Sequence, residues 1–154
     1  MHLISIMRAG FLVLTLCAAF LLPLHAAENL KLNPKLDYDS DSHDGPLIIG
    51  ERMEEGLAAG KPNYVIFFGE ECYNSKRQAR RTVSLYNKYK GRVQFVIVDM
   101  DVKRSDAHKD LVRTHYHGYI PHITIFDKSG KVVYDSAGEF SEEEISAILD
   151  RALK

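Results

Sequence analysis

The fold of this 154-residue chain is decided by the stretch Tyr64–Ser75, which reads YVIFFGEECYNS. Its first five residues form an unbroken apolar run, which is typical of a strand that is covered on both faces of its sheet. The segment after Ser75 is basic and has helical spacing, so the strand should lead through a turn at Gly69 into a helix that begins at Cys72. Backbone N–H groups at a helix N-terminus stabilise an anion, so a thiol there ionises more readily than a free thiol. Cys72 is therefore the candidate reactive residue.

The first 26 residues have the layout of a secretory signal peptide. Arg8 precedes a nearly unbroken apolar run, Ala9–Leu24, and we expect cleavage near Ala26. A membrane anchor is the alternative, but this run is shorter than the roughly 20 residues that a helical span requires. Cys17 lies inside the run and is assigned to the discarded peptide. Cys72 is then the only cysteine of the mature chain.

Length and composition bound the rest of the chain. A hydrophobic content of 45% in 154 residues corresponds to one globular domain with a substantial core, and a second full domain is not expected. The 20 basic and 21 acidic residues give a net charge of −1, which offers no case for a nucleic-acid partner. We expect a monomer with no stable membrane span after processing and no cofactor.

Residues 27–46 are polar and acidic, and they show neither helical nor strand periodicity. Their carboxylates include Asp37, Asp39, Asp41 and Asp44. A metal-binding loop is one interpretation, but regularly placed oxygen ligands around a glycine turn are missing, so a solvated segment is favoured. We predict a flexible acidic linker over 27–46 and an ordered domain over 47–154.

Periodicity predicts the elements of this domain. Ile49, Met53 and Leu57 fall at spacings of four and predict a short first helix. The elements expected after the strand at 64–68 are a long amphipathic helix closed by Gly91, a buried strand at 93–98, a helical segment at 105–115, a strand at 122–126, its hairpin partner at 131–135, and a terminal helix with a capping box at Ser141 and Glu144. Two buried strands joined by a helix form a parallel crossover, and the hairpin is antiparallel. The predicted class is therefore α/β with a mixed sheet.

This order resembles the thioredoxin superfamily over Leu47–Lys154. The marks of the resemblance are the turn that carries Cys72, the helix ending at 86–91, the strand ending at 99–101, Tyr119-Ile120-Pro121, and Gly138 before the last helix. The resemblance implies a three-layer α/β/α sandwich with a four-stranded mixed central sheet. It also implies that Pro121 is cis beside the active cysteine and that the backbone of Ile120 can pair with an extended substrate.

Four positions depart from the pattern of that family. Ser75 stands where the resolving cysteine is usual, Ile66 stands where many members keep a buried acid, and Glu71 and Asn74 replace a common aromatic residue and a common proline. Without a second cysteine, Cys72 is restricted to monothiol exchange, in which a small thiol or a second substrate cysteine resolves the mixed disulfide. Ser75 can still donate a hydrogen bond to the thiolate.

Charged neighbours act on the thiol of Cys72 in opposite directions. Lys76 and Arg77, which we place on the exposed surface of the helix, favour the thiolate, whereas Glu70 and Glu71 disfavour it. Which of these two effects on the thiol is larger depends on where the charged side chains lie in the folded protein.

The predicted function is that of an exported thioredoxin-like protein, a candidate monothiol oxidoreductase that exchanges mixed disulfides of protein or small-molecule thiols. In a Gram-negative host it would be periplasmic, and otherwise secreted or membrane-tethered. Catalytic roles are predicted for Cys72 and Ser75, substrate-binding roles for Ile120, Pro121, Tyr73 and Asn74, and no metal site is predicted.

Two other functions stay open. One is a redox-inactive peptide-binding module with the same fold, and the other is a metal carrier that uses Cys72 with a histidine. His115, His117 and His122 bracket Pro121. They fit three roles: structural or surface residues, a partner of the thiolate, or metal ligands.

Overall fold

A computed structural model describes residues 26–43 and 45–154 of the chain. Residues 1–25, which hold most of the predicted signal peptide and Cys17, lie outside the described residues. The elements in chain order are β1 (Glu28–Leu32), β2 (Ile48–Glu51), β3 (Asn63–Phe68), α1 (Tyr73–Tyr89), β4 (Gln94–Asp99), α2 (Asp106–His115), β5 (His122–Phe126), β6 (Val132–Ala137) and α3 (Glu142–Ala152). None of the helices in this described part has the length and apolar character needed to cross a membrane.

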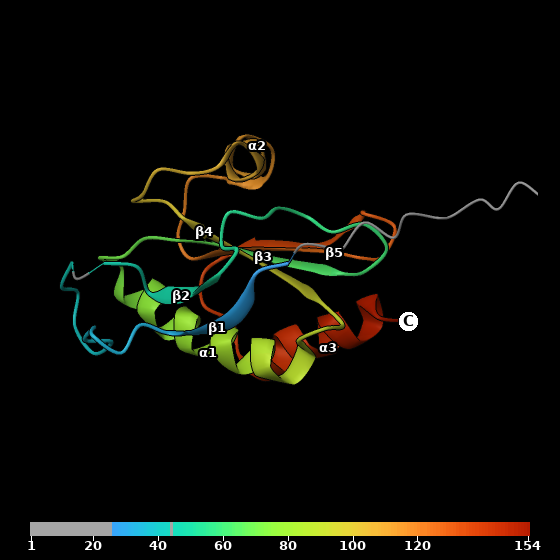
Figure 1. The fold of residues 1–154 in the computed structure, drawn as a ribbon. Helices are drawn as coiled ribbons and strands as arrows, with labels where there is room; N and C mark the ends of the chain where they lie inside the picture. Colours follow the sequence, from blue (N-terminus) through green and yellow to red (C-terminus); the bar gives the residue numbers. More distant parts are fainter. Residues whose placement is uncertain (1–25, 44) are drawn as a thin grey trace, which may run out of the picture.

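Four strands form the central sheet in the order β4-β3-β5-β6. β3 pairs parallel with β4 and antiparallel with β5, and β5 pairs antiparallel with β6, so the sheet is mixed as predicted. Figure 1 shows α1 and α3 on one face of the sheet and α2 on the other. This arrangement confirms the predicted three-layer α/β/α sandwich with a four-stranded mixed sheet.

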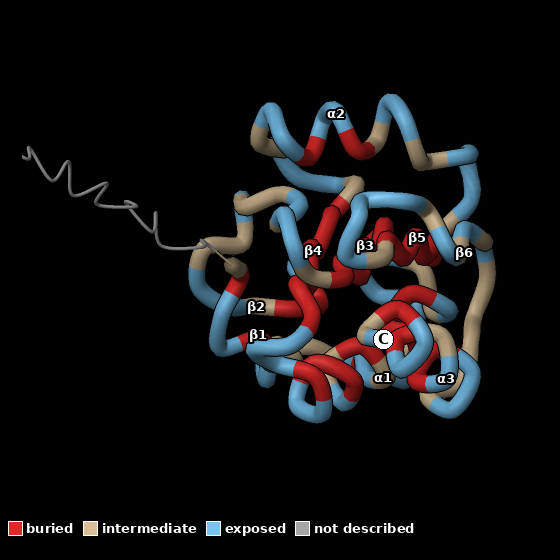
Figure 2. Tube along the Cα trace, turned by 90° about the vertical axis from the view of Figure 1, so that its right-hand side faces the viewer, coloured by how far each residue is buried: buried red, intermediate tan, exposed pale blue. Residues whose placement is uncertain are grey.

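The core consists of two apolar layers, one on each face of the sheet. All six residues of β3 are buried, because the strand lies in the middle of the sheet and is covered on both sides. Its side chains alternate, so that Ile66 belongs to the layer beneath α1 and α3, and Phe67 to the layer beneath α2. Figure 2 shows the buried segments gathering in β3, β4, β5 and the inward sides of the helices.

Residues 27–46 do not form the predicted flexible linker over the part that the structure describes. β1 pairs antiparallel with β2, and the buried side chain of Leu30 lies in the core layer beneath α1. The backbone N–H of Asn29 donates a hydrogen bond of 2.9 Å to the hydroxyl of Tyr86 on α1. The segment is therefore part of the domain, and a second two-stranded sheet lies against α1.

The short helix predicted from Ile49, Met53 and Leu57 is also wrong. Residues 48–51 form β2 instead, because pairing with β1 supplies their backbone hydrogen bonds. Gly50 permits this close pairing, since a Cβ atom at that position would lie 2.7 Å from the backbone oxygen of Glu28. Three apolar residues at a spacing of four were too short a pattern to distinguish a helix from a strand followed by turns.

The other local predictions are confirmed with small shifts of their boundaries. Gly91, directly after the C-cap of α1, and Gly130, in the β5–β6 turn, have φ values of 81° and 84°, the left-handed conformation expected of them. Ser141 and Glu144 form the predicted capping box of α3, with each side chain bonded to the other's backbone N–H.

The attachment of the N-terminal segment can be tested at Tyr38, a buried residue with an exposed fraction of 8%. Its hydroxyl accepts from the N–H of Asn33 and donates to the carbonyl of Leu47. We expect Tyr38→Phe to lower the free energy of unfolding in urea by about 1–2 kcal/mol, because the hydrogen bonds of the hydroxyl to the N–H of Asn33 and the carbonyl of Leu47 are lost. The control Tyr119→Phe changes a residue that is 73% exposed and should have no effect. Equal stability of the two variants would contradict this attachment and favour a flexible linker.

Candidate functional site

Cys72 is the N-cap residue of α1, directly after the turn that leaves β3. Its backbone N–H donates to the carbonyl of Gly69 over 3.3 Å, and its own carbonyl accepts from the N–H of Lys76 over 3.0 Å. The side chain is half-buried and makes no capping hydrogen bond, and the first turn of α1 contains no acidic residue. The N–H groups of that turn are thus available to a negative charge on the sulfur.

The loop before β5 places a cis peptide bond beside this sulfur. The Ile120–Pro121 bond is cis, as the resemblance implied, and the thiol of Cys72 donates to the carbonyl of Ile120 with 3.9 Å between sulfur and oxygen. The carbonyl of Pro121 accepts from the N–H of Gly138 over 2.8 Å, which fixes the loop to the end of β6. Gly69 provides the space for Ile120, because a Cβ atom there would lie 2.5 Å from the Cδ1 atom of Ile120.

Ser75 lies in the first turn of α1 and is fully buried. Its hydroxyl oxygen accepts a hydrogen bond of 3.3 Å from the backbone N–H of Gly69. The hydroxyl therefore braces the turn before Cys72, and its proton remains able to donate. A catalytic role for Ser75 stays a prediction, whereas its structural contact is observed.

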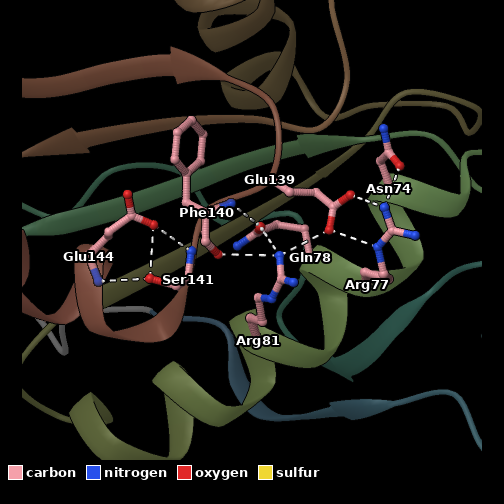
Figure 3. A network of polar contacts seen from close by, with 8 residues as sticks. All are labelled: Asn74, Arg77, Gln78, Arg81, Glu139, Phe140, Ser141 and Glu144. Atoms are coloured by element: carbon pink, nitrogen blue, oxygen red, sulfur yellow. Dashed lines mark hydrogen bonds and ion pairs between the residues drawn. The ribbon is translucent and has the colours of Figure 1, made fainter.

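The two predicted substrate-binding residues of α1 lie at the surface beside Cys72. The guanidinium of Arg77 lies 4.3 Å from the ring centroid of Tyr73, and it donates over 2.8 Å to the side-chain oxygen of Asn74. Arg77 also donates to Glu139 from the loop before α3, and Arg81 donates to the same carboxylate over 3.0 Å (Figure 3). Hydrogen bonds from Arg77 hold the pKa of Glu139 below its ordinary value.

This network connects the surface beside Cys72 to the C-terminal helix. Arg81 also donates to the carbonyl of Phe140, and Gln78 accepts from the N–H of that residue over 2.9 Å. Ser141, the next residue, begins α3 through its capping box with Glu144 (Figure 3). The N-terminal half of α1 is therefore held against the start of α3 by hydrogen bonds that include charged groups.

Lys76 is buried, contrary to the prediction that it lies on the exposed surface of the helix. Its ammonium group donates to the backbone carbonyls of Asp37 and Ser42 over 2.7 and 2.8 Å. The neighbouring His43 lies 3.6 Å from the carboxylate of Glu70 and 3.3 Å from that of Glu71. No sequence pattern indicates these contacts, because the oxygens that hold Lys76 belong to the backbone.

The site contains a buried acid, but it is Asp99 at the end of β4 and not the residue at position 66. Ile66 is fully buried and apolar. Burial raises the pKa of Asp99 to about 7, and the adjacent Glu70 carboxyl acts in the same direction. One carboxyl oxygen of Asp99 is buried without a hydrogen-bond partner among the described residues, and the residue lines a cavity of about 350 Å³ next to β2.

The three histidines near Pro121 do not share one environment. The ring of His115 packs edge-on against Phe126, with 5.0 Å between ring centroids. His117 and His122 both contact Asp135 on β6. In the described part of the chain, one group of three side chains could hold a metal ion, namely His117, His122 and Asp135, and Cys72 is not a member of it.

Asp99 makes a testable contribution to the pH dependence of stability. Its folded pKa lies above the ordinary value of 3.8, so the folded state holds a proton that the unfolded state loses, and stability falls as pH rises from about 4 to 7. We expect the free energy of unfolding of Asp99→Asn, measured in urea, to rise relative to that of the wild type by roughly 1–3 kcal/mol as the pH is raised from 5 to 8. The reason is that one pKa unit corresponds to about 1.4 kcal/mol.

The matched control for this measurement is Asp110→Asn, because Asp110 lies exposed on α2. The free energy of unfolding of this variant should differ from that of the wild type by a nearly constant amount over the same pH range. Parallel pH curves for Asp99→Asn and the wild type would contradict the raised pKa.

Comparisons with known proteins agree with this geometry. The sequence profile named "Thioredoxin-like domain" matches residues 49–153. A comparison with curated protein sequences finds no match. Among solved structures, the chain is similar to an uncharacterised thioredoxin-like protein from Clostridium perfringens, with 18% identity, a TM-score of 0.53, and 62% of this chain and 75% of that chain covered.

Two further solved structures give the same result. StoA from Bacillus subtilis has 14% identity and a TM-score of 0.50, with 58% of this chain and 83% of that chain covered. Chloroplastic thioredoxin z has 22% identity and a TM-score of 0.50, with 60% of this chain and 79% of that chain covered. Identities this low establish the fold and not the activity. Together with the profile match over most of the chain, they lead to one conclusion: this protein belongs to the thioredoxin-like family.

Proposed function

We propose that this protein is an exported thioredoxin-like protein that acts through Cys72 in thiol–disulfide exchange on mixed disulfides of protein or small-molecule thiols. The observation that carries the proposal is the position of Cys72. Its half-buried side chain lies at the N-terminus of α1 and contacts the carbonyl that precedes the cis Pro121. A thiol in that position is accessible, and the backbone N–H groups of the first turn of α1 can donate to a negative charge on its sulfur.

The exchange proceeds in two balanced steps. In the first step, the Cys72 thiolate attacks one sulfur of a mixed disulfide, a new disulfide to Cys72 forms, and the other sulfur leaves as a thiolate. In the second step, a small thiol or a second cysteine of the substrate attacks this new bond and restores the Cys72 thiolate. Ser75 cannot perform the second step because it has no sulfur, so the resolving thiol comes from outside the chain.

The carbonyl of Ile120 gives the substrate a place to align. In the thiol form of the site, this carbonyl accepts from Cys72. Once the thiol ionises, the carbonyl loses that donor and becomes free to accept an N–H group from an extended substrate, in the manner of a strand added to a sheet edge. Tyr119, which is 73% exposed, and the half-buried Tyr73 supply apolar surface on the two segments that meet at the sulfur.

Export is part of the proposal and rests on the layout of residues 1–26. An exported protein meets thiols in an oxidising compartment, where mixed disulfides persist. A single cysteine that is resolved by external thiols suits such substrates, because the protein is not trapped in an internal disulfide of its own.

Covalent capture tests the proposal directly. The purified protein, incubated with an oxidised small thiol at neutral pH and quenched with acid, should gain the mass of one thiol at Cys72 in intact and peptide mass spectrometry. The reason is that the attacking thiolate stays disulfide-bonded until another thiol resolves it. Cys72→Ser should abolish this adduct. If Cys72 forms no adduct while a free cysteine peptide reacts fully, the protein is better described as a redox-inactive binding module.

A gain-of-function variant tests whether the site retains the geometry of exchange. Ser75→Cys places a second thiol three residues after Cys72, at the start of α1, where the family's dithiol pair is located. We expect this variant to form an internal disulfide and to reduce insulin faster than the wild type, because each mixed disulfide can then be resolved within the molecule. Ser84→Cys is the control, because Ser84 is exposed farther along the same helix, beside Glu142 of α3, and it should give no such gain. A Ser75→Cys variant that folds but never oxidises internally would contradict the proposed geometry.

A further inference from the structure

A second chemically competent cluster lies directly beyond Pro121, on the α2 side of the sheet. The Nε2 atom of His122 lies 2.5 Å from one carboxyl oxygen of Asp135, and the Nε2 atom of His117 lies 3.1 Å from the other. The three side chains can each offer a ligand atom, and these atoms all lie within 4.8 Å of one another. Neither Cys72 nor any residue of its helix takes part.

The fold itself brings these residues together. His122 begins β5, and the register of the β5–β6 hairpin pairs Thr124 with Asp135, so that His122, Thr124 and Asp135 share one face of the sheet. The hydroxyl of Thr124 donates over 3.2 Å to the same oxygen of Asp135 that contacts His122. The loop after α2 carries His117 over this face. Two of the three side chains are thus fixed by sheet geometry.

The three side chains differ in burial, so that the cluster is fixed inside the protein on one side and reaches solvent on the other. The side chain of His122 is only 1% exposed, that of Asp135 is 29% exposed, and that of His117 is 61% exposed. The carboxylate of Asp135 lies between the two imidazoles, and the site is open to solvent on the side of His117.

We propose that His117, His122 and Asp135 bind a divalent transition-metal ion of the zinc class, with a fourth position open to solvent. Two imidazoles and one carboxylate form the donor set that zinc takes in sites with three protein ligands and one exchangeable position. Magnesium and calcium prefer sites made of oxygen alone, so they should bind far more weakly.

The surroundings of His122 limit the affinity of the proposed site. Coordination through Nε2 leaves the remaining proton on Nδ1, which is buried without a partner among the described residues. The ring packs against the aromatic rings of Phe67 and Tyr116, with centroids 5.6 and 6.2 Å apart. Metal-bound histidines usually donate this second N–H. We therefore expect a site that exchanges its metal, with weaker binding than a closed structural zinc site.

The test uses the purified protein with Zn²⁺ by isothermal titration calorimetry and with Co²⁺ by visible absorption. We expect one equivalent to bind and to raise the thermal midpoint of unfolding, because a ligand that binds only the folded state stabilises it. His117→Ala and Asp135→Asn should each raise the dissociation constant for Zn²⁺ by at least about 10-fold. The reason is that loss of even an outer-shell partner of a metal ligand lowers metal affinity about 10- to 100-fold. His117→Ala removes an exposed side chain and should leave the metal-free stability unchanged.

Two controls distinguish this site from metal binding elsewhere on the chain. His43→Ala removes a histidine of similar exposure, 54% against 61%, that lies near Glu70 and Glu71, and it should bind metal like the wild type. The double variant Cys17→Ser/Cys72→Ser removes both cysteines of the chain and should also bind like the wild type. Binding that is absent, that survives His117→Ala, or that disappears with the cysteines would overturn the proposed site. The double variant has no exchange activity in any case, so this result is independent of the exchange chemistry.

Discussion

The complete burial of β3 is the constraint on which the rest of the structure depends. Because both faces of this strand are covered, helices must lie above and below it, and its two neighbours must occupy both of its edges. The strand leaves the sheet at Gly69, and the turn that follows places Cys72 at the N-cap position of α1 and next to Ile120. The position of the sulfur is thus a consequence of core packing, and the antiparallel pairing of β5 with β3 brings the loop with Pro121 to the same end of β3.

A second consequence is that the site is supported from segments that are far apart in the sequence. Residues 37–43 hold Lys76 through backbone carbonyls and bring His43 to the acids that precede Cys72. Glu139 holds Arg77 and Arg81 from the other side of α1. The helix that carries the thiol is therefore clamped on both flanks, which keeps its N-terminal N–H groups in a fixed relation to the sulfur.

The sequence predicted the features that depend on local patterns. The apolar run at 64–68, the glycine turns and the capping box of α3 each have short-range causes, and the structure confirms them. β1 was missed because its pairing with β2 is not local and leaves no periodic trace in a polar segment. The His117–His122–Asp135 cluster and the position of Asp99 beside Glu70 were missed because they arise from strand register and burial, which a single sequence does not display.

Folding should activate Cys72, because it places the thiol at the N-terminus of α1. The most direct test compares the second-order rate constant for reaction of Cys72 with a small aromatic disulfide at neutral pH in the native protein and in urea, with Cys17 replaced by Ser in both samples. The native protein should react faster, because the sulfur is held in a half-buried but open position where the N–H groups of the helix terminus can donate to it. A native rate constant below that of the unfolded chain would contradict this activation, because folding would then shield the thiol.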